Sequence, residues 1–412
     1  MKQYTLEVDP RMTDVVDRLQ QAGYETYIVG GAIRDLLLGR RPKDYDISTA
    51  ATPEQVREVF GRRSIRIIGR RFRLAHLHLG KEIIEISTFR RAPEGHGRAV
   101  NAAEEDRLPE NIILSDNDYG TVEEDAQRRD FTVNSLYYDP VREELLDFNG
   151  HGLEDIENGV VRAIGDAKLR FEEDPVRILR ALKLVGQYDF ALDAETENAV
   201  FSSLPLIRFA SPSRLSLELE KVLSSAYGDK HLRAFHDYGF LEYFLPFLHK
   251  NWDTKPMQYA MELFTERNYR VDEGAYRNSI SLACAVLALP FVEEAAGNDC
   301  GQLWSPDRHA VHLIRQVLKE IFQPQNMINS VMQSAEHILR LQPGMYNMED
   351  DGSVIGTYGY NHAREVIAIQ NFVCWQDERL SDFWPADNAP RRRNNKRPQR
   401  KHHKKKSPGG TE

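Results

Sequence analysis

The sequence has few cysteines and no long apolar segment, and both absences exclude whole classes of protein. Its 412 residues include three cysteines, Cys284, Cys300 and Cys374, an odd count without metal-type spacing, which excludes a disulfide scaffold or a zinc site. The longest apolar run, residues 280–292, is interrupted by a serine and a proline and is too short to cross a bilayer. The N-terminus lacks the basic and then apolar pattern of a signal peptide. We therefore expect a soluble, cytoplasmic protein with reduced thiols.

Positive charge is scarce in most of the chain and concentrated at one end. The net charge is −9, yet residues 391–412 carry ten Lys and Arg and one acid, a net +9. The other 44 basic and 62 acidic residues give residues 1–390 a net charge of −18. This asymmetry predicts that contact with an anionic polymer is concentrated at the tail and in local clefts. The alternative is a tail that only improves solubility. The basic residues of the tail are Arg391, Arg392, Arg393, Lys396, Arg397, Arg400, Lys401, Lys404, Lys405 and Lys406.

Two aspartates, Asp44 and Asp46, follow Pro42. Because proline does not continue a helix, we expect a strand to begin just after Pro42. Side chains i and i+2 of a strand share a face, so both carboxylates would lie side by side, with Tyr45 and Ile47 pointing into a core. Paired carboxylates repel unless a cation lies between them, and Mg²⁺ accepts one or two carboxylates while leaving room for substrate phosphates. The alternative is a solvated strand edge with two acids.

A glycine pair upstream of the aspartates favours the metal-site interpretation. Residues 26–29 are β-prone, Gly30 and Gly31 follow, and the next residues predict a short helix that ends at Gly39. Glycines at such a junction let backbone N–H groups approach a phosphate at the helix N-terminus. Arg34, on the same helix, would offer its guanidinium to that phosphate. The alternative is a glycine pair that only makes the turn.

A third carboxylate is predicted to reach the same place from a neighbouring strand. Residues 65–79 and 82–89 are β-prone and predict a strand pair with a turn at residues 80–81. Glu85 lies between two isoleucines, so it would point to the sheet face that carries the aspartates. Three carboxylates suit a two-metal phosphoryl-transfer site. Ordinary alternation of exposed polar residues explains Glu85 equally well.

A cluster of Arg128, Arg129 and Asp130 follows residues 92–120, a polar, acidic segment that we expect to form a mobile loop. Arg129 is a candidate ligand for a triphosphate. Asp130 is a candidate acceptor from a ribose hydroxyl or a ligand of a metal. The alternative is a ladder of ion pairs one helical turn apart, for instance Glu124 with Arg128.

A helix is predicted to begin at Pro175, with Asp174 as its N-cap. Arg177 and Arg180 lie on one face of this helix, with Asp174 one turn earlier. A carboxylate beside a guanidinium presents acceptors and donors at a fixed spacing, which suits reading the edge of a base. The alternative is a capped helix with two surface arginines.

The rest of the chain is assigned from hydrophobic periodicity and composition. The assignments are helices at residues 9–22 and 213–223, a strand pair over 137–149, a loop over 151–166, a helical pattern from about 171 to 376, and disorder after residue 384. The prediction is therefore an α+β region followed by an all-α region.

Together these motifs resemble those of the class II tRNA nucleotidyltransferase and bacterial poly(A) polymerase family, within the DNA polymerase β-like nucleotidyltransferase superfamily. The matching segments, in the order of the family, are residues 30–35, 44–46, 128–134, 173–177 and 214–218. The resemblance implies an α+β nucleotidyltransferase head with a mixed sheet and flanking helices, then an all-α neck, body and tail. The implied division is an N-terminal helix at 1–23, the head at 24–150, a neck at 151–225, a body at 226–380 and a disordered basic tail at 381–412.

The resemblance also implies roles for the candidate residues. Asp44 and Asp46 would hold Mg²⁺ in a two-metal mechanism, and Glu85 and Asp130 compete as the third catalytic acid. No nucleic-acid template would be used, because side chains of the neck would select the base. The residues expected to contact the incoming nucleotide are Gly30, Gly31, Arg34, Arg129, Asp174, Arg177 and Arg180.

Residues 67–77 and the basic tail resemble the poly(A) polymerase branch of the family. That branch implies ATP as substrate and single-stranded RNA 3′ ends as acceptor, with the tail binding phosphates without reading sequence. One alternative is CCA addition to tRNA by the same site. Another is a non-catalytic RNA-binding protein that retains the fold, against which the intact Asp44, Asp46 and Arg34 argue. Protein partners, such as RNA-decay or RNA-chaperone proteins, do not follow from the sequence.

Overall fold

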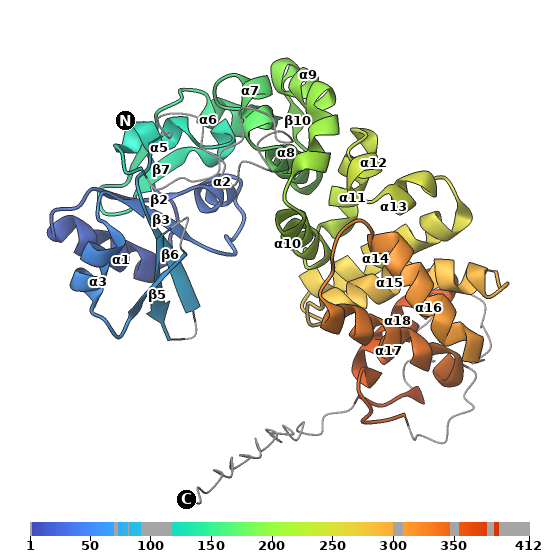
Figure 1. Ribbon diagram of the computed structural model, residues 1–412. Coiled ribbons are helices and arrows are strands. Elements are labelled where there is room, and N and C mark those ends of the chain that lie inside the picture. Colours follow the sequence, from blue (N-terminus) through green and yellow to red (C-terminus); the bar gives the residue numbers. More distant parts are fainter. Residues whose placement is uncertain are drawn as a thin grey trace, which may run out of the picture.

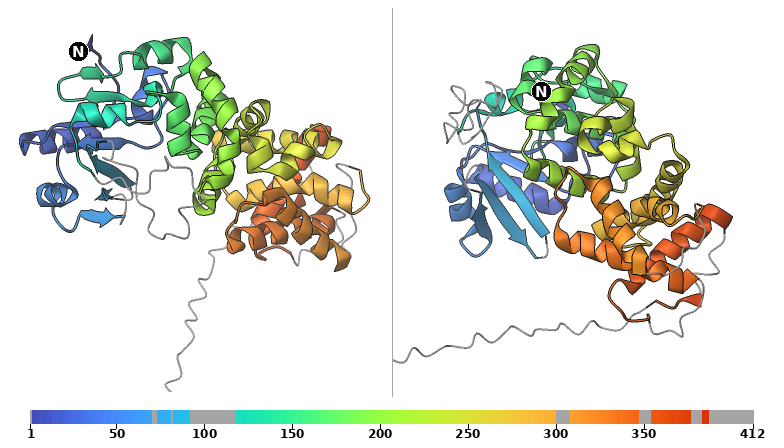
Figure 2. Two further views of the ribbon diagram at one scale, coloured as in Figure 1. Left: turned by 45° about the horizontal axis from the view of Figure 1, so that its top comes forward. Right: turned by 45° about the vertical axis from the view of Figure 1, so that its right-hand side comes forward.

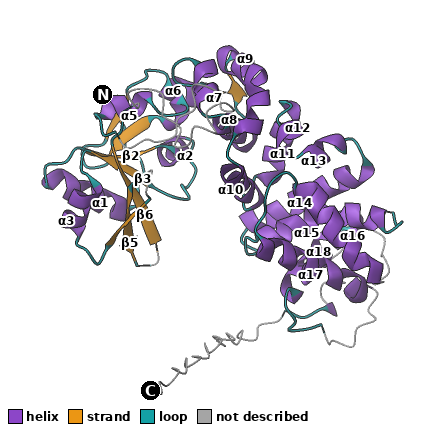
Figure 3. Cartoon of the chain, in the orientation of Figure 1, coloured by secondary structure: helices purple, strands orange, loops and turns teal. Residues whose placement is uncertain are grey.

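The computed structural model describes residues 2–69, 73–80, 82–91, 118–299, 308–346, 354–376 and 383–386. The molecule is curved, with a head built around a sheet at one end and a helical body at the other (Figure 1). Two further views show the connecting neck helices between these ends (Figure 2). The head combines strands with helices, and helices make up most of the remaining described chain (Figure 3). The expected order of an α+β region followed by an all-α region is confirmed.

An eight-stranded mixed sheet forms the centre of the head, in the order β1-β8-β7-β2-β3-β6-β5-β4. Its strands are β1 (Lys2–Gln3), β2 (Thr26–Val29), β3 (Asp46–Thr49), β4 (Ile65–Ile68), β5 (Leu74–Leu79), β6 (Glu82–Thr88), β7 (Leu136–Asp139) and β8 (Glu144–Asp147). Pairing is parallel between β3 and β6 and antiparallel between the other neighbours. Strand β3 therefore has a neighbour on each side, and residues of β2 and β6 lie directly beside it.

Helices cover both faces of this sheet. The head helices are α1 (Pro10–Gln21), α2 (Gly31–Leu37), α3 (Pro53–Phe60), α5 (Val122–Gln127), the 3₁₀ turn η1 (Thr132–Asn134) and α6 (Gly152–Asn158). On one face, Ile28, Ile47 and Ile86 belong to the core that contains the apolar sides of α1 and α3. On the other face, Val29 and Tyr137 pack with apolar residues of α5. The part of this second face above β3 and β6 is polar.

The remaining elements form the neck and the body. The neck, as the term is used below, comprises α7 (Ala167–Glu173), α8 (Val176–Tyr188), α9 (Ala194–Ser203), η2 (Leu204–Phe209) and α10 (Pro212–Leu223), with the short parallel pair β9 (Val160–Val161) and β10 (Ala191–Leu192). The body comprises α11 (Gly228–Asp237), α12 (Leu241–Phe244), α13 (Pro246–Lys250), α14 (Lys255–Asp272), α15 (Ile280–Ala295), α16 (Arg308–Phe322), α17 (Asn329–Tyr346) and α18 (Tyr360–Trp375).

The longest apolar run of the sequence lies in α15, whose apolar residues are buried in the body. None of the described helices is long and apolar enough to cross a membrane. One connected cluster of buried apolar side chains extends from the head through the neck into the body. The neck is thus packed against both of its neighbours.

The structure corrects the predicted start of the aspartate strand. Strand β3 begins at Asp46, and Asp44 lies in the preceding loop. The reason is the pairing partner: Asp46 is opposite Val29, the last residue of β2, and the next residue, Gly30, turns away into α2. Strand alternation therefore does not apply to Asp44.

Two other local predictions also change. Residues 65–79 form two strands, β4 and β5, rather than one. Residues 151–166, predicted as a loop, contain α6 and β9. Helix α6 is held by its Asp155, which accepts hydrogen bonds from Thr132, outside this segment, and from Arg162 within it. It ends at Gly159, which has the left-handed conformation (φ 65°) that glycine tolerates.

Several predictions concern residues that the structure does not describe. Most of the expected loop at 92–120 and part of the segment at 67–77 lie outside the described residues, as does most of the tail at 381–412. The ten basic residues of the tail are among them. The division into five domains also stays a prediction.

Candidate active site

The Gly30–Gly31 turn joins β2 to α2 beside the first carboxylate. Gly30 has φ 75° and ψ −139°, which residues with a side chain rarely adopt. A Cβ atom on Gly30 would lie 3.5 Å from Nη1 of Arg129 and 3.9 Å from Oδ2 of Asp46. The turn therefore brings backbone close to a guanidinium and a carboxylate that lie far from each other in sequence.

Asp46 and Glu85 lie side by side on adjacent strands. They are opposite each other in the parallel β3–β6 pair, and two residues further on Ser48 and Ser87 are also paired, with 2.9 Å between their hydroxyl oxygens. The prediction that Glu85 shares a face with Asp46 is confirmed by this register. A pocket of about 380 Å³ opens on this face. It is lined by Val29, Asp46, Leu74, Glu85, Ser87, Thr88, Arg90, Asp125, Arg128, Arg129, Asp130 and Asn134.

Asp46 is a buried carboxylate with other negative charges close to it. Burial raises the pKa of the Asp46 carboxyl, and the negative charges of Glu85 and Asp44 raise it further. Arg129 opposes this effect without overcoming it. A carboxylate whose pKa is raised by neighbouring negative charges attracts a cation.

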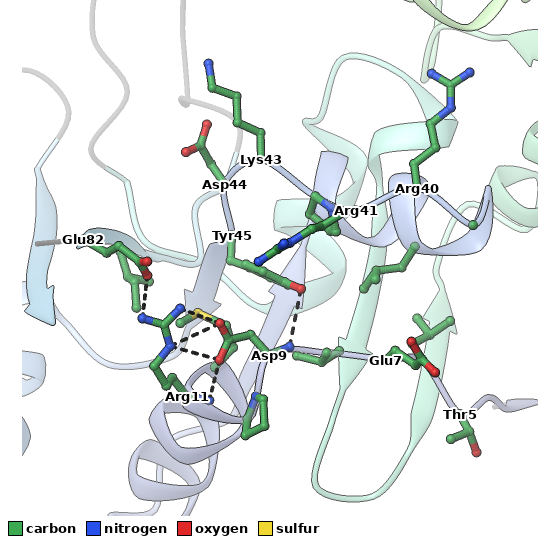
Figure 4. Close-up of a pocket in the computed structure, with 18 of the residues that line it drawn as sticks. Thr5, Glu7, Asp9, Arg11, Arg40, Arg41, Lys43, Asp44, Tyr45 and Glu82 are labelled. Atoms are coloured by element: carbon green, nitrogen blue, oxygen red, sulfur yellow. Dashed lines mark hydrogen bonds and ion pairs between the residues drawn. The ribbon is translucent and has the colours of Figure 1, made fainter. Parts of the chain in front are cut away.

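Asp44 lies on a loop that is held in place by a contact of the next residue, Tyr45. The Tyr45 hydroxyl accepts a hydrogen bond from the backbone N–H of Asp9 at 3.4 Å. Arg11 pairs with Asp9 at 2.5 Å and with Glu82 at 2.7 Å. These contacts lie in a cavity of about 1120 Å³, where Tyr45 turns toward Asp9 and Asp44 points the opposite way (Figure 4). Asp44 lines this cavity and not the pocket of Asp46, although its charge acts on Asp46.

Arg129 is held at the pocket by a network that the sequence did not reveal. Its guanidinium donates to the Tyr137 hydroxyl at 2.8 Å, to Asp125 at 3.1 Å and to the Ser48 hydroxyl at 3.2 Å. Asp125 also accepts from the Tyr137 hydroxyl at 2.6 Å. The acidic run before Arg128 was the available signal, because α5 places its residue 125 one turn before Arg129.

The ladder of ion pairs considered for this cluster is formed in part, by Asp125 with Arg129 one turn later and not by Glu124 with Arg128. Glu124 accepts from the backbone N–H of Thr121 in a capping box at the start of α5. Arg128 instead lies 3.8 Å from Asp125. Burial lowers the pKa of Arg128 to about 10, and neighbouring arginines add to the effect. Positive charge is therefore concentrated beside the carboxylate pair.

Asp130 connects the head to the neck. It accepts from Nε of Arg177 at 2.8 Å and from Nη1 of Arg180 at 2.5 Å. Burial acts to raise the pKa of Asp130, but the charges of Arg180 and Arg177 outweigh it and lower the pKa. Arg177 also donates to Glu173 at 2.9 Å and is buried. The alternative of two surface arginines on a capped helix is therefore wrong for Arg177.

Asp174 does not have the expected helix position. Helix α8 starts at Val176, one residue later than predicted, with Pro175 as the residue before it. The Asp174 carboxylate still accepts from the backbone N–H of Val176 at 3.2 Å. Its other oxygen accepts from Arg214 of α10 at 2.7 Å. Asp174 and Arg177 thus each have protein partners.

Arg34 is enclosed by three polar partners and one aromatic ring. It donates to Asn134 at 2.5 Å, to Asp35 at 2.8 Å and to the hydroxyl of Tyr188 at 2.5 Å. The guanidinium carbon lies 4.2 Å from the centre of the Tyr188 ring, and that of Arg40 lies 4.7 Å from the same ring. Tyr188 ends α8, and sequence analysis gave no signal for its role.

The donor set on this face suits a hard divalent cation bound together with phosphates. Among the described residues, no group of three or more His, Cys, Asp or Glu is close enough to hold a metal by itself. Mg²⁺ does not need such a cage, because one or two carboxylates and substrate phosphates satisfy it. Asp46 with its raised pKa and Glu85 beside it offer such ligands on this face, and the negative charge of Asp44 adds to the attraction for a cation.

Comparison with known proteins identifies two matching family models. Residues 26–162 match the poly A polymerase head domain. Residues 189–251 match a probable RNA and SrmB-binding site of polymerase A. The first region contains the glycine turn and both strand carboxylates, and the second lies in the neck and the start of the body.

Curated relatives that match more than half of this chain are named poly(A) polymerase I or CCA-adding enzyme. Poly(A) polymerase I of Haemophilus influenzae is 40% identical over 330 residues, which cover 74% of this chain and 72% of that protein. Poly(A) polymerase I of Escherichia coli O157:H7 is 37% identical over 70% of this chain and 62% of that protein. The CCA-adding enzyme of Geobacillus stearothermophilus is 35% identical over 56% and 53%.

Solved structures show the same fold at low identity. The CCA-adding enzyme of Bacillus stearothermophilus in complex with CTP has a TM-score of 0.60 and 24% identity over 91% of this chain and 80% of that chain. A tRNA nucleotidyltransferase with a primer tRNA and an incoming ATP analogue has a TM-score of 0.57 and 21% identity over 90% and 97%. From its sequence, its motifs and this fold, the chain belongs to the family of the bacterial poly(A) polymerases and tRNA nucleotidyltransferases.

Proposed function

We propose that this protein is a template-independent polynucleotide adenylyltransferase that adds AMP from ATP to the 3′ ends of RNA. The observation that carries the proposal is the pocket in which Asp46 and Glu85 lie side by side next to the Gly30 turn and Arg129. Family membership points to the same reaction, because the relatives with 37–40% identity are named poly(A) polymerase I.

The nucleotide phosphates would lie between the glycine turn and the arginines. Gly30 and Gly31 leave room for a phosphate at the start of α2, and Arg129 lies beside that space. Arg34 lies on α2 itself and is oriented by Asn134. Catalysis then depends on positioning and on charge stabilisation of the triphosphate.

The carboxylates would bind Mg²⁺ and orient the RNA 3′-hydroxyl toward the α-phosphate. Asp46 and Asp44 are the proposed ligands, and Glu85 is favoured as the third acid. Asp130 is less suited to that role, because both of its oxygens accept from arginines. Bound Mg²⁺ would lower the pKa of the attacking hydroxyl and offset the charge of the departing pyrophosphate.

The base would be selected by the N-terminal part of α8 and by Asp174, which lies two residues before this helix. Asp174 and Arg177 are the proposed pair, and Arg180 lies one turn further along. The contacts of Arg177 with Asp130 and Glu173 fix the orientation of its guanidinium before a nucleotide arrives. A fixed donor set favours one base edge over the others.

The test is nucleotide incorporation with each of the four NTPs on two acceptors. A short unstructured RNA and a tRNA without its CCA end distinguish the two activities of this family. We expect long runs of AMP on the unstructured RNA and little use of CTP. Addition of C, C and A to the tRNA alone would favour a CCA-adding enzyme. RNA binding without any incorporation would favour the non-catalytic alternative.

Site variants connect that activity to the proposed carboxylates. Asp46→Asn should lower the rate by roughly a thousandfold or more, because a lost metal ligand costs several kcal/mol of transition-state stabilisation. Asp44→Asn should also lower it strongly, while both variants still bind RNA. Glu54→Gln is a matched control, since this exposed carboxylate pairs with Arg73 outside the pocket. Full activity of Asp46→Asn would contradict the assignment.

A further inference from the structure

A row of charged and polar side chains crosses four strands at the edge of the pocket. Asp46 of β3 is opposite Glu85 of β6, Glu85 is opposite His76 of β5, and His76 is opposite Arg66 of β4. Side chains paired in this way point to the same face of the sheet. The row therefore places a histidine directly beside one of the two strand carboxylates, on the side away from Asp46.

The contact between His76 and Glu85 is close and unevenly exposed. Nε2 of His76 lies 3.3 Å from Oε1 of Glu85, and the side chains are 18% and 53% exposed. Among the described residues, His76 is the one basic side chain within 4 Å of the Glu85 carboxylate. The imidazole is mostly enclosed and its Nε2 makes no hydrogen bond with a described residue, while the Glu85 side chain is half exposed.

We propose that His76 is a positioning residue that holds the Glu85 carboxylate in place for cation binding beside Asp46. The inference rests on the proposed function. Two neighbouring carboxylates repel each other, and this repulsion would drive the exposed Glu85 side chain into solvent. His76 opposes that movement because its Nε2, which has no hydrogen-bond partner of its own among the described residues, lies 3.3 Å from one carboxylate oxygen of Glu85. Residues that orient a metal ligand in this way commonly affect metal affinity as strongly as tenfold or more.

The test measures cation binding directly and does not depend on turnover. Mn²⁺, which gives an electron paramagnetic resonance signal when free in solution, is titrated into the full chain with a non-hydrolysable ATP analogue. The variants are His76→Ala, His76→Gln, Glu85→Gln and the double variant His76→Ala/Glu85→Gln. His78→Ala is the matched control, because His78 lies on the same face of β5 and is paired with Ile83 instead of an acid.

A positioning role predicts a specific pattern of affinities. His76→Ala and Glu85→Gln should each weaken Mn²⁺ binding about tenfold. The double variant should be no weaker than Glu85→Gln alone, because His76 acts through Glu85. His76→Gln keeps an N–H donor and should recover most of the affinity, and His78→Ala should bind like the wild type. In AMP addition, His76→Ala should need more Mg²⁺ with an unchanged KM for RNA.

Other outcomes separate this inference from the proposed function. Wild-type affinity in His76→Ala, or a further loss in the double variant relative to Glu85→Gln, would overturn the role of His76. If His76→Ala does not fold, equal affinities of Glu85→Gln and the wild type would overturn it as well. A wild-type protein that binds no Mn²⁺ with the analogue and adds no AMP would instead overturn the proposed function.

Discussion

The Asp130 side chain both connects the head to the neck and lines the candidate active site. It belongs to the head, and its two partners, Arg177 and Arg180, lie 47 and 50 residues later on the neck helix α8. It also lines the pocket of Asp46. Because the two guanidiniums lower its pKa against the effect of burial, the ionised form of Asp130 stabilises the folded protein.

Asp130→Asn should lower the free energy of unfolding by about 3 kcal/mol at neutral pH, because it removes the negative charge that faces the buried Arg177 and the partly exposed Arg180. The stability that Asp130 contributes is present above its unfolded pKa, close to 3.8, and is lost as the pH falls through its lower folded pKa. The difference between wild type and variant should therefore be constant from pH 7 to about 5 and shrink below about 4. Urea unfolding at several pH values measures it.

Asp174→Asn is the matched control for this prediction. Asp174 pairs with Arg214, whose side chain is 45% exposed, so its loss should cost less than about 1 kcal/mol. If the difference in the free energy of unfolding between the wild type and Asp130→Asn grew toward low pH, the stabilisation would not come from the ionised form of Asp130.

Arg177 is the residue at which stability and selectivity should be separable. Arg177→Ala should relax the preference for ATP by about 1–3 kcal/mol, the usual value of a bidentate base contact. Arg170→Ala is its control, because Arg170 is also largely buried and also pairs with Glu173, at 3.1 Å. Both variants should unfold more easily, and only Arg177→Ala should incorporate the other NTPs more readily. Equal selectivity in both variants would show that Arg177 is structural alone.

At the level of elements, helix α8 is attached to the head at both of its ends. Arg177 and Arg180 bind Asp130 near its start, and Tyr188 at its end contacts α2. The Tyr188 hydroxyl donates to Asp35 at 2.7 Å and accepts from Arg34 at 2.5 Å. A helix fixed at two points can hold base-selecting side chains in a constant position relative to the carboxylates of the sheet.

Tyr188→Phe tests the second attachment. It keeps the ring between the guanidiniums of Arg34 and Arg40 and removes the hydroxyl, so it should cost about 1–2 kcal/mol. Tyr188→Ala should cost more, about 3–5 kcal/mol, because it also leaves a cavity. Urea unfolding of the three proteins measures both losses. If Tyr188→Phe matches the wild type, the hydroxyl contacts do not stabilise the attachment.

At the level of the whole molecule, the net negative charge of most of the chain opposes the RNA binding that the proposed function requires. Residues 1–390 have a net charge of −18, and an RNA substrate is also negative. Around the site, Arg128, Arg129 and Arg180 provide local positive charge. The sequence places the largest excess of positive charge in residues 391–412. We therefore expect the tail to supply much of the affinity for RNA.

Truncation after Ala389 should weaken binding to all RNA sequences alike. It should also reduce the steepness of the slope of log affinity against log salt concentration by several units, since each phosphate contact on a single strand contributes roughly 0.7 to that slope. AMP addition at saturating RNA should stay nearly unchanged. The measurement is a salt titration of RNA binding for the full chain and the truncated chain. Parallel lines would show that clefts in residues 1–389 hold the RNA without help from the tail.

The sequence by itself determined the order of the parts and named Asp44, Asp46 and Glu85 as candidate carboxylates. Alternation along β6 put Glu85 on the polar face, and the Gly30–Gly31 pair predicted the turn into α2, because both depend on the preferences of neighbouring residues. The periodicity of the later segments predicted helices for the same reason. Local rules of this kind were sufficient to predict that the head is α+β and that the region after it is helical.

Only the tertiary structure decided which side chains meet. Strand β3 starts at Asp46 because its partner strand ends at Val29, and no property of residues 42–46 contains that information. The contacts of Asp130 with Arg177 and of Arg34 with Tyr188 join residues 47 and 154 positions apart. Long-range pairs of this kind depend on how whole elements pack. The local sequence favours a backbone conformation, whereas the packing of the elements decides which distant residues lie next to each other.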